Sequence, residues 1–402
     1  MKKILSLSKK TMQNPLTKNN LYLIFLLFIA LGVYLSFIGG YGSDEDTLAM
    51  IYVFQRIFYE GTFASSRFTG YPVAEIGIGF LSHFFGSWAA NLITFLFLVS
   101  SLYLFYESLN LDKKSNKKEL LIFIIICLSN PILYFDNIEP MDYSWALFFF
   151  SFGMFFLKKN IYEVAVLLFG ISIGTRLNFG LFVIILLLFF NYPNKMVYLR
   201  KFYLIICSIF IGCLFYLPIW YYNSFSLEWV TAARPLEQGY LGLLARVIYK
   251  SFLAFGGLVF FYLIYQFITK LKIIKRDKNF YLCVFLSISN LLIFFWIPAE
   301  LSYIQILLIS IFYLLSKHIN IFALVIIFFL NFSTWLIQID LVEITHRYDD
   351  KCKPIQALSV RPKLVIKDGY FFKYLNTRDM IKCFVDENST RGKKIINGEA
   401  LK

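Results

Sequence analysis

Long apolar runs alternate with short polar connections along most of the chain. The first run, Leu21 to Gly39, has about the roughly 20 residues that an α-helix needs to cross the hydrocarbon core of a bilayer. Later apolar runs fall near residues 88–107, 119–133, 143–157, 161–175, 177–191, 202–221, 250–269, 280–297, 301–316 and 321–339. These runs have helical length and lack the short alternation of a membrane β-barrel. The pattern predicts an all-α polytopic membrane protein with about eleven transmembrane helices.

Basic residues are concentrated in every second connection between these runs. The lysine- and arginine-rich connections lie near residues 2–18, 113–118, 158–159, 195–201, 270–278 and 317. By the positive-inside rule, these connections and the amino terminus are cytoplasmic. Residues around 40–87, 134–142, 222–249 and 297–301 are then outside. The apolar runs predict a transmembrane domain over residues 1–340, followed by a small tail over residues 341–402. Because the number of spans is odd, the tail is expected to be extracytoplasmic.

Composition supports a membrane protein and excludes an ordinary soluble one. Of 402 residues, 59% are hydrophobic and 16% are charged, and the mean hydropathy is +0.66. Soluble domains average about 45–50% apolar and about 25% charged residues. The net charge of +14 is accounted for by the basic connections, so we expect no nucleic-acid partner. A bacterial plasma membrane is the expected location.

Residues 161–191 lie between two basic connections, so they must cross the membrane twice or not at all. The segment Gly174 to Asn178 is the expected break between two short helices, which places Arg176 near the outer face. An arginine between apolar helices is costly unless it is paired or faces an aqueous cavity. Arg176 is therefore a candidate phosphate ligand, and a salt bridge to a loop carboxylate is the alternative.

The first outer segment carries three consecutive acids, Asp44, Glu45 and Asp46, directly after the first span. Carboxylates at the outer end of a span are solvated at little cost and can still point into a cavity between helices. They form a candidate catalytic centre. Alternatively, they complement the dipole of an amphipathic helix that Ser43 caps and that continues along the membrane surface.

Other polar residues give weaker indications. Asp136, Glu139 and Asp142 form an acidic cluster in the second outer segment, for which a solvated loop is the favoured interpretation. His83 is expected to be packed or interfacial. Cys352 and Cys383 both fall in the tail, where an oxidising compartment permits a disulfide between them without requiring it.

Three motifs carry a resemblance to a known superfamily. The first outer segment contains the pattern Ser-Arg-x-x-Gly-Tyr-Pro-x-x-Glu, which ends at Glu75 and precedes a glycine-rich apolar helix. A second motif spans Gly170 to Asn178, and a third spans Trp296 to Tyr303. In this order the motifs resemble those of the C-type membrane glycosyltransferases, such as the protein O-mannosyltransferases and the lipid A aminoarabinose transferase. Leu177 stands where these enzymes usually have proline, and Ser302 where they often have arginine.

The resemblance implies a large multi-span fold with an active site on the outer face, beneath the first outer segment. Members use sugars linked to polyprenyl phosphate, so the partners are this donor, membrane lipid and a glycan, lipid or protein acceptor. By motif position, Asp44 is the first choice for the catalytic base. Glu45 and Asp46 are alternatives that could instead orient the acceptor or hold a divalent cation, and no other cofactor is implied.

Residues of the other motifs are implied in substrate binding. Arg176 would bind the donor phosphate, and Tyr71 and Glu75 would contact substrate, although Glu75 could instead be an exposed interfacial carboxylate. Arg67 is a weaker candidate because interfacial arginines often only extend to the headgroups. Glu139 would line the acceptor side.

The third motif adds Glu300 and Tyr303 to the substrate-binding candidates. The expected reaction is a single displacement that inverts the anomeric centre, with a carboxylate taking the acceptor proton and positive charge stabilising the departing phosphate. The product would be a cell-surface glycan or glycolipid. The alternative function is a transporter or flippase of lipid-linked glycans. The sequence leaves open the sugar, the acceptor, the lipid length and the oligomeric state.

Overall fold

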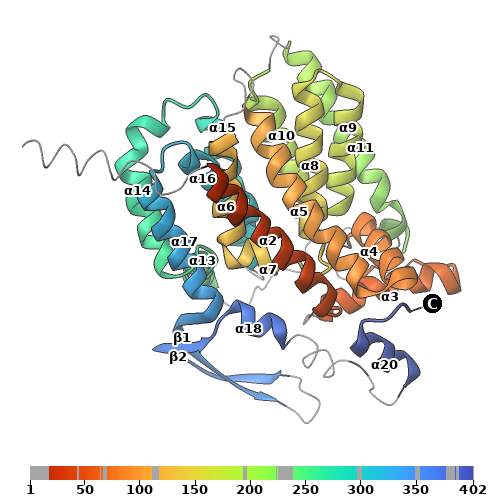
Figure 1. Ribbon diagram of the computed structural model, residues 1–402. Helices are drawn as coiled ribbons and strands as arrows, with labels where there is room; N and C mark the ends of the chain where they lie inside the picture. The colour runs from red at the N-terminus through yellow and green to blue at the C-terminus, as the bar shows by residue number, and fades with distance from the viewer. Residues whose placement is uncertain are drawn as a thin grey trace, which may run out of the picture.

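The computed structural model describes residues 18–42, 45–63, 65–66, 70–110, 117–192, 197–222, 224, 239–296, 301–348, 354–376, 385 and 389–401. Nearly all of the regular structure is helical, and the helices pack lengthwise into one bundle (Figure 1). The helices are α2 (Lys18–Ile38), α3 (Glu45–Glu60), α4 (Pro72–Phe85), α5 (Ser87–Leu109), α6 (Lys117–Ser129), α7 (Pro131–Phe135), α8 (Asp142–Lys158), α9 (Tyr162–Thr175), α10 (Phe179–Phe189), α11 (Tyr198–Tyr222), α13 (Gly239–Ala254), α14 (Leu258–Ile274), α15 (Phe280–Trp296), the 3₁₀ helix η2 (Leu301–Ile304), α16 (Gln305–Ser316), α17 (Ile321–Leu336), α18 (Tyr370–Leu375) and α20 (Thr390–Asn397).

Within the described residues, three helices are long and apolar enough to cross a membrane: α2, α5 and α11. A fourth candidate is the pair α13 and α14, which is bent by 89° at a short break. The other apolar helices have 10–17 residues. The membrane character is therefore supported, whereas about eleven spans are not confirmed.

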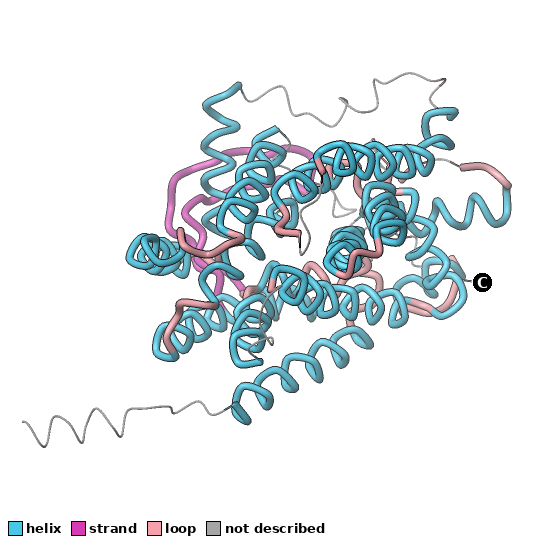
Figure 2. The backbone as a smooth tube through the Cα atoms, turned by 90° about the horizontal axis from the view of Figure 1, so that it is seen from above, coloured by secondary structure: helices cyan, strands magenta, loops and turns pink. Residues whose placement is uncertain are grey.

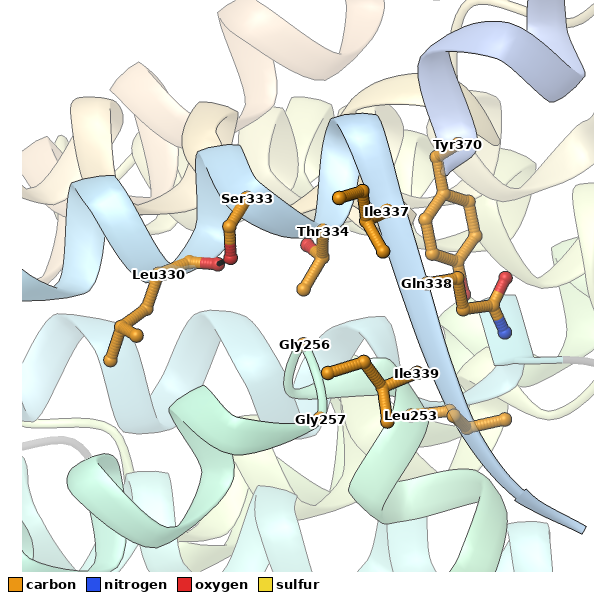
Figure 3. Close-up of a pocket in the computed structure, with 10 residues that line it drawn as sticks. All are labelled: Leu253, Gly256, Gly257, Leu330, Ser333, Thr334, Ile337, Gln338, Ile339 and Tyr370. Carbon is orange, nitrogen blue, oxygen red and sulfur yellow. Dashed lines mark hydrogen bonds between the residues drawn. The ribbon is translucent and has the colours of Figure 1, made fainter. Parts of the chain in front are cut away.

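The predicted run over residues 250–269 is not one straight helix. Gly256 and Gly257 have φ angles of +85° and +61°, in the left-handed region that glycine adopts without strain, and they turn the chain from α13 into α14. A Cβ on Gly256 would lie 2.9 Å from Oδ1 of Asn331 on α17, so the turn packs closely against that helix. Figure 3 shows this turn facing Thr334 and Ile337, where α17 ends, across a small cavity of about 40 Å³.

The C-terminal part adds β-structure, which corrects the all-α prediction. Strands β1 (Ile337–Tyr348) and β2 (Pro354–Asp368) form an antiparallel hairpin in which Ile337 pairs with Asp368. The last apolar run ends as a helix at Leu336, so β1 begins before the expected tail boundary at residue 340. Seen from above, the strands and the C-terminus lie on opposite flanks of the bundle (Figure 2).

The connections are grouped at two ends of the bundle, as their charges predict. At the hairpin end, Tyr374 Oη donates to Leu35 O at 3.1 Å, and Ser87 N donates to Gly398 O at 3.0 Å. At the other end, called the basic end, Asn279 Nδ2 donates to Leu109 O at 2.7 Å. Which end faces the cytoplasm stays a prediction from the basic residues.

Small residues set the position of α9, the helix that leads to Arg176. Gly170 and Gly174 are four residues apart and share one face, which packs against α11. A Cβ on Gly170 would lie 2.4 Å from Ile211, and one on Gly174 would lie 2.5 Å from Phe215. Helices that approach this closely need small residues at the interface. The Gly-x-x-x-Gly spacing therefore fixes α9 on α11 one turn before Arg176.

Candidate functional site

The site is built around the break between α9 and α10. Helix α9 ends at Thr175, and Arg176 follows in extended conformation with φ −147° and ψ 118°. Its N–H still donates to Ser172 O at 3.0 Å, and its carbonyl accepts from Phe179 N at 3.0 Å, where α10 begins. The predicted helix break is confirmed. It directs the side chain of Arg176 away from the axes of both helices and into the bundle.

Arg176 forms a buried ion pair with Asp142, the first residue of α8. Arg176 Nη1 lies 2.7 Å from Asp142 Oδ2, and the two side chains are 3% and 0% exposed. The solvated-loop interpretation was therefore wrong for Asp142, while the salt bridge considered for Arg176 is present. A buried charge is tolerated only with such a partner, since the desolvation penalty is several kcal/mol per ion.

Three tyrosine rings surround the guanidinium of Arg176. Its Cζ lies 4.0 Å from the ring centroid of Tyr143, 4.6 Å from that of Tyr303 and 5.1 Å from that of Tyr71. The rings come from α8, η2 and the residue before α4, so four distant segments meet here. Such cation–π contacts contribute about 0.5–2 kcal/mol each, with the larger values for desolvated pairs. Of these rings, sequence reasoning identified Tyr71 and Tyr303 but missed Tyr143.

Glu75 lies one turn beyond Tyr71, in the first turn of α4, and is fully buried. Its Oε1 accepts from Ser66 N at 2.9 Å and from Ser66 Oγ at 2.5 Å. The alternative of an exposed interfacial carboxylate is therefore wrong. Tyr216 on α11, which the sequence analysis did not single out, donates through Oη to Ile173 O at 3.2 Å, in the last turn of α9 before Arg176. Tyr216 lies within a long apolar run, and no sequence motif distinguishes it.

The segment that carries Tyr303 is fixed on both sides. Ser302 Oγ donates to Asp136 Oδ2 at 2.5 Å, and Asn290 Nδ2 on α15 donates to Tyr303 O at 2.8 Å. The rings of Tyr143 and Tyr303 also meet edge to face, with their centroids 5.8 Å apart. Ser302, which stands where the resembling enzymes often have arginine, therefore joins the third motif to the acidic second outer segment.

The start of α3 lies beside the buried ion pair. Thr47 Oγ1 donates to Met141 Sδ at 3.3 Å, and each of these residues adjoins an acid: Asp46 and Asp142. Asp46 is half-buried in the first turn of α3. This contact brings the first turn of α3, with Asp46, close to the chain next to Asp142.

Glu139 also borders the first outer segment. Gly42 has φ +84°, and a Cβ there would lie 3.0 Å from Glu139 Oε2. Glu139 and Asp136 are half-buried, so the loop that they share is less solvated than the sequence indicates.

Several candidates fall outside the described residues: Asp44, Arg67, Glu300 and the side chain of Glu45. Cys352 and Cys383 fall outside as well, so the disulfide between them stays open. In the part of the chain that the structure describes, no group of three or more His, Cys, Asp or Glu residues could hold a metal ion. A divalent cation at the acidic run stays a prediction. His83 is packed among aromatic rings, as expected, with its ring 5.0 Å from that of Phe58.

Arg176, Tyr143, Ser302 and Tyr303 line a narrow cavity in this region. It has room for about one water molecule. Arg176 has five N–H donors, and the hydrogen bond found among the described residues, to Asp142, uses one amino group of the guanidinium.

Comparisons with protein-family models, with curated proteins and with solved structures found no match for this chain. The glycosyltransferase resemblance therefore stays a prediction from the three sequence motifs.

Proposed function

We propose that this chain is an integral membrane glycosyltransferase that transfers a sugar from a polyprenyl-phosphate donor to an acceptor hydroxyl at the hairpin end. One observation carries the proposal: motif residues from three distant segments meet at one buried arginine. Tyr71 and Tyr303 contact Arg176, and Glu75 lies one helical turn from Tyr71. Packing alone requires no such meeting of motif residues.

Arg176 supplies the positive charge that a departing phosphate needs. A guanidinium binds phosphate oxygens through two parallel hydrogen bonds, and in a water-excluded site these bonds stabilise developing negative charge strongly. Asp142 holds the guanidinium in place, and the three rings restrict its orientation. The donor phosphate would enter at the cavity that Ser302 and Tyr303 line. Because this cavity has room for about one water molecule, it must widen when a donor binds.

The acids at the start of α3 supply the base. A carboxylate of Asp44, Glu45 or Asp46 would take the proton from the acceptor hydroxyl while the sugar leaves the phosphate. The contact between Thr47 and Met141 supports this arrangement because it brings the start of α3 to the chain next to Asp142. A single carboxylate acting without a covalent intermediate gives inversion, by the logic of inverting glycosidases.

A transporter or flippase of lipid-linked glycans is the second candidate, and the bend between α13 and α14 favours it. Discontinuous helices of this kind form the substrate sites of many secondary transporters. Beside the bend, α13, α14, α15 and α16 line an apolar groove of about 410 Å³ that a lipid chain could occupy. A lipid-linked donor needs such a groove too, so the groove alone does not separate the two functions.

Transfer of radiolabelled sugar from a panel of polyprenyl-phosphate sugars to membrane acceptors tests the proposal. Membranes would contain wild type, Asp44→Asn or Lys317→Met at matched expression, with Lys317→Met as the control at the basic end. We expect wild-type-dependent transfer, a loss of about 100-fold or more for Asp44→Asn, and no loss for the control. Label that changes leaflet without transfer, for every donor, would replace the enzyme by the transporter.

A further inference from the structure

A second cavity lies between α3 and the C-terminal helix α20. It shares no lining residue with the cavity at Arg176. Its volume is about 630 Å³, within the range of small-molecule sites. One wall is a face of α3 that carries Tyr52, Arg56 and Tyr59, at positions i, i+4 and i+7 of the helix. The other wall carries Arg391 and Lys394, which are three residues apart on one face of α20. An aromatic and basic face of α3 therefore opposes a basic face of α20.

The C-terminal segment is held firmly enough to serve as a wall. Tyr41 Oη donates to Glu399 O at 2.7 Å, and Leu401 N donates to His83 O at 3.1 Å. Ile395 is buried in one apolar cluster with Leu48 and Ile51 of α3. The cavity is thus a feature of the packed fold, with α20 anchored by its apolar face and its basic face turned to the opening.

The lining combines positive charge with aromatic surface. Three cationic side chains are present against one carboxylate, that of Glu60. The guanidinium of Arg391 lies 4.5 Å from the ring centroid of Tyr52, so charge and ring are already adjacent. Cations of this kind favour an anionic group, and tyrosine offers a flat apolar surface with a polar tip that suits a ligand with both apolar and hydroxyl-bearing faces.

We propose that this cavity binds an anionic sugar unit, phosphorylated or carboxylated, of the acceptor glycan. The inference deepens the proposed function, on which it rests, by naming the acceptor class. Tyr52 lies about 9 Å along α3 from Asp46, at the rise of about 1.5 Å per residue in an α-helix. An acceptor bound here would extend along α3 toward the acids that activate its hydroxyl.

Calorimetric titration of the full-length chain in detergent tests the site with glucose 6-phosphate, glucose and inorganic phosphate. We expect glucose 6-phosphate to bind more tightly than either of the other two. Arg391→Gln should weaken its binding about tenfold, since one charge-assisted contact is lost. Lys393→Gln is the matched control, because Lys393 is exposed on the same helix and does not line the cavity. Tyr52→Ala should weaken binding of the sugar phosphate and leave phosphate binding unchanged.

Three outcomes would overturn the site. The first is that Arg391→Gln binds glucose 6-phosphate as tightly as wild type does. Equal affinity for inorganic phosphate and the sugar phosphate, with no effect of Tyr52→Ala, would mean a plain anion site. Loss of sugar-phosphate binding in nanodiscs of phosphatidylglycerol, with retention in phosphatidylcholine, would mean that a lipid headgroup is the occupant.

The two proposals fail separately. Wild type that binds glucose 6-phosphate as expected but transfers no sugar from any donor refutes the glycosyltransferase and leaves the anionic-sugar site standing. Wild type that transfers sugar, but whose Arg391→Gln variant binds the probe normally, refutes the site alone.

Discussion

Two ion pairs, one at each end of the bundle, hold their charges in different ways. At the hairpin end, Arg176 and Asp142 are 3% and 0% exposed and are enclosed by rings. At the basic end, Lys317 and Asp277 lie 2.8 Å apart and are 14% and 11% exposed. Desolvation makes the first pair costly to form, whereas the second keeps part of its hydration.

The neighbours of each pair explain the difference. Lys317 Nζ also donates to Tyr313 Oη at 2.6 Å, and the hydroxyl of Tyr313 accepts from Asn279 at 3.0 Å. These bonds tie the connections of the basic end together, which is a structural task. The Arg176 pair instead gathers residues that the motifs predicted for substrate binding. An ionisable residue buried in a membrane-spanning region is by default a functional-site hypothesis, and the proposed phosphate site is that hypothesis for Arg176.

The largest effect is expected when the buried pair loses one partner. Asp142→Asn leaves the guanidinium of Arg176 buried without a counter-charge, and should destabilise the protein by about 3–5 kcal/mol. Thermal unfolding of the purified protein in detergent measures this as a lower midpoint. Adding Arg176→Gln to the same protein should restore much of the loss, because a neutral amide pair avoids the buried charge. An Asp142→Asn protein that unfolds like wild type would show that the pair is hydrated in solution.

A smaller effect is expected at the ring that faces Arg176 from η2. Tyr303→Ala removes the cation–π contact and should cost about 1–2 kcal/mol, while Tyr303→Phe keeps the ring and should cost less. Unfolding midpoints of both variants, compared with wild type, provide the measurement. Equal losses for the two variants would assign the stabilisation to the hydroxyl and not to the ring.

The pair at the basic end should matter less. Lys317→Met keeps the length of the side chain and removes its charge, and the loss should be about 1 kcal/mol or below, as for partly exposed pairs. The same unfolding assay measures it. A loss as large as that of Asp142→Asn would remove the distinction between the two ends.

The smallest effect concerns pH and His318, which lies between α16 and α17 at the basic end. Burial lowers the pKa of His318 below its ordinary value of 6.5, so the folded state favours the neutral ring. Its contribution to stability is complete above pH 6.5 and is lost as the pH falls through the lowered pKa. The unfolding midpoint should fall on acidification, and His318→Gln should reduce that fall. If the unfolding midpoint of His318→Gln falls with pH as much as that of wild type, other groups cause the fall.

The sequence predicted most of the helices because hydropathy reports burial in an apolar environment directly. The run over residues 143–157 became α8, and the break at Gly174 to Asn178 lies where the motif placed it. Ion pairs are harder to predict from the sequence, because the pattern of charges does not show which carboxylate an arginine will contact. Asp142 was therefore taken for a loop residue.

Backbone turns inside apolar runs were also missed. Gly256 and Gly257 carry no polar signal, and their effect depends on φ angles that only the folded chain reveals. Tyr143 and Tyr216 were not recognised because aromatic residues are frequent in every span of this chain. The hairpin begins within four residues of the predicted end of the last span, since β1 and α17 share one apolar run.

Binding of a fluorescent polyprenyl phosphate tests the central claim, that the buried arginine is the donor-phosphate site, most directly. The proteins compared would be wild type, the Asp142→Asn and Arg176→Gln double variant, and Lys317→Met, each shown to be folded by its unfolding midpoint. We predict that wild type and Lys317→Met bind with the same Kd, and that the folded double variant binds at least about tenfold more weakly. Equal Kd values for all three proteins would contradict the account and make Arg176 a structural residue.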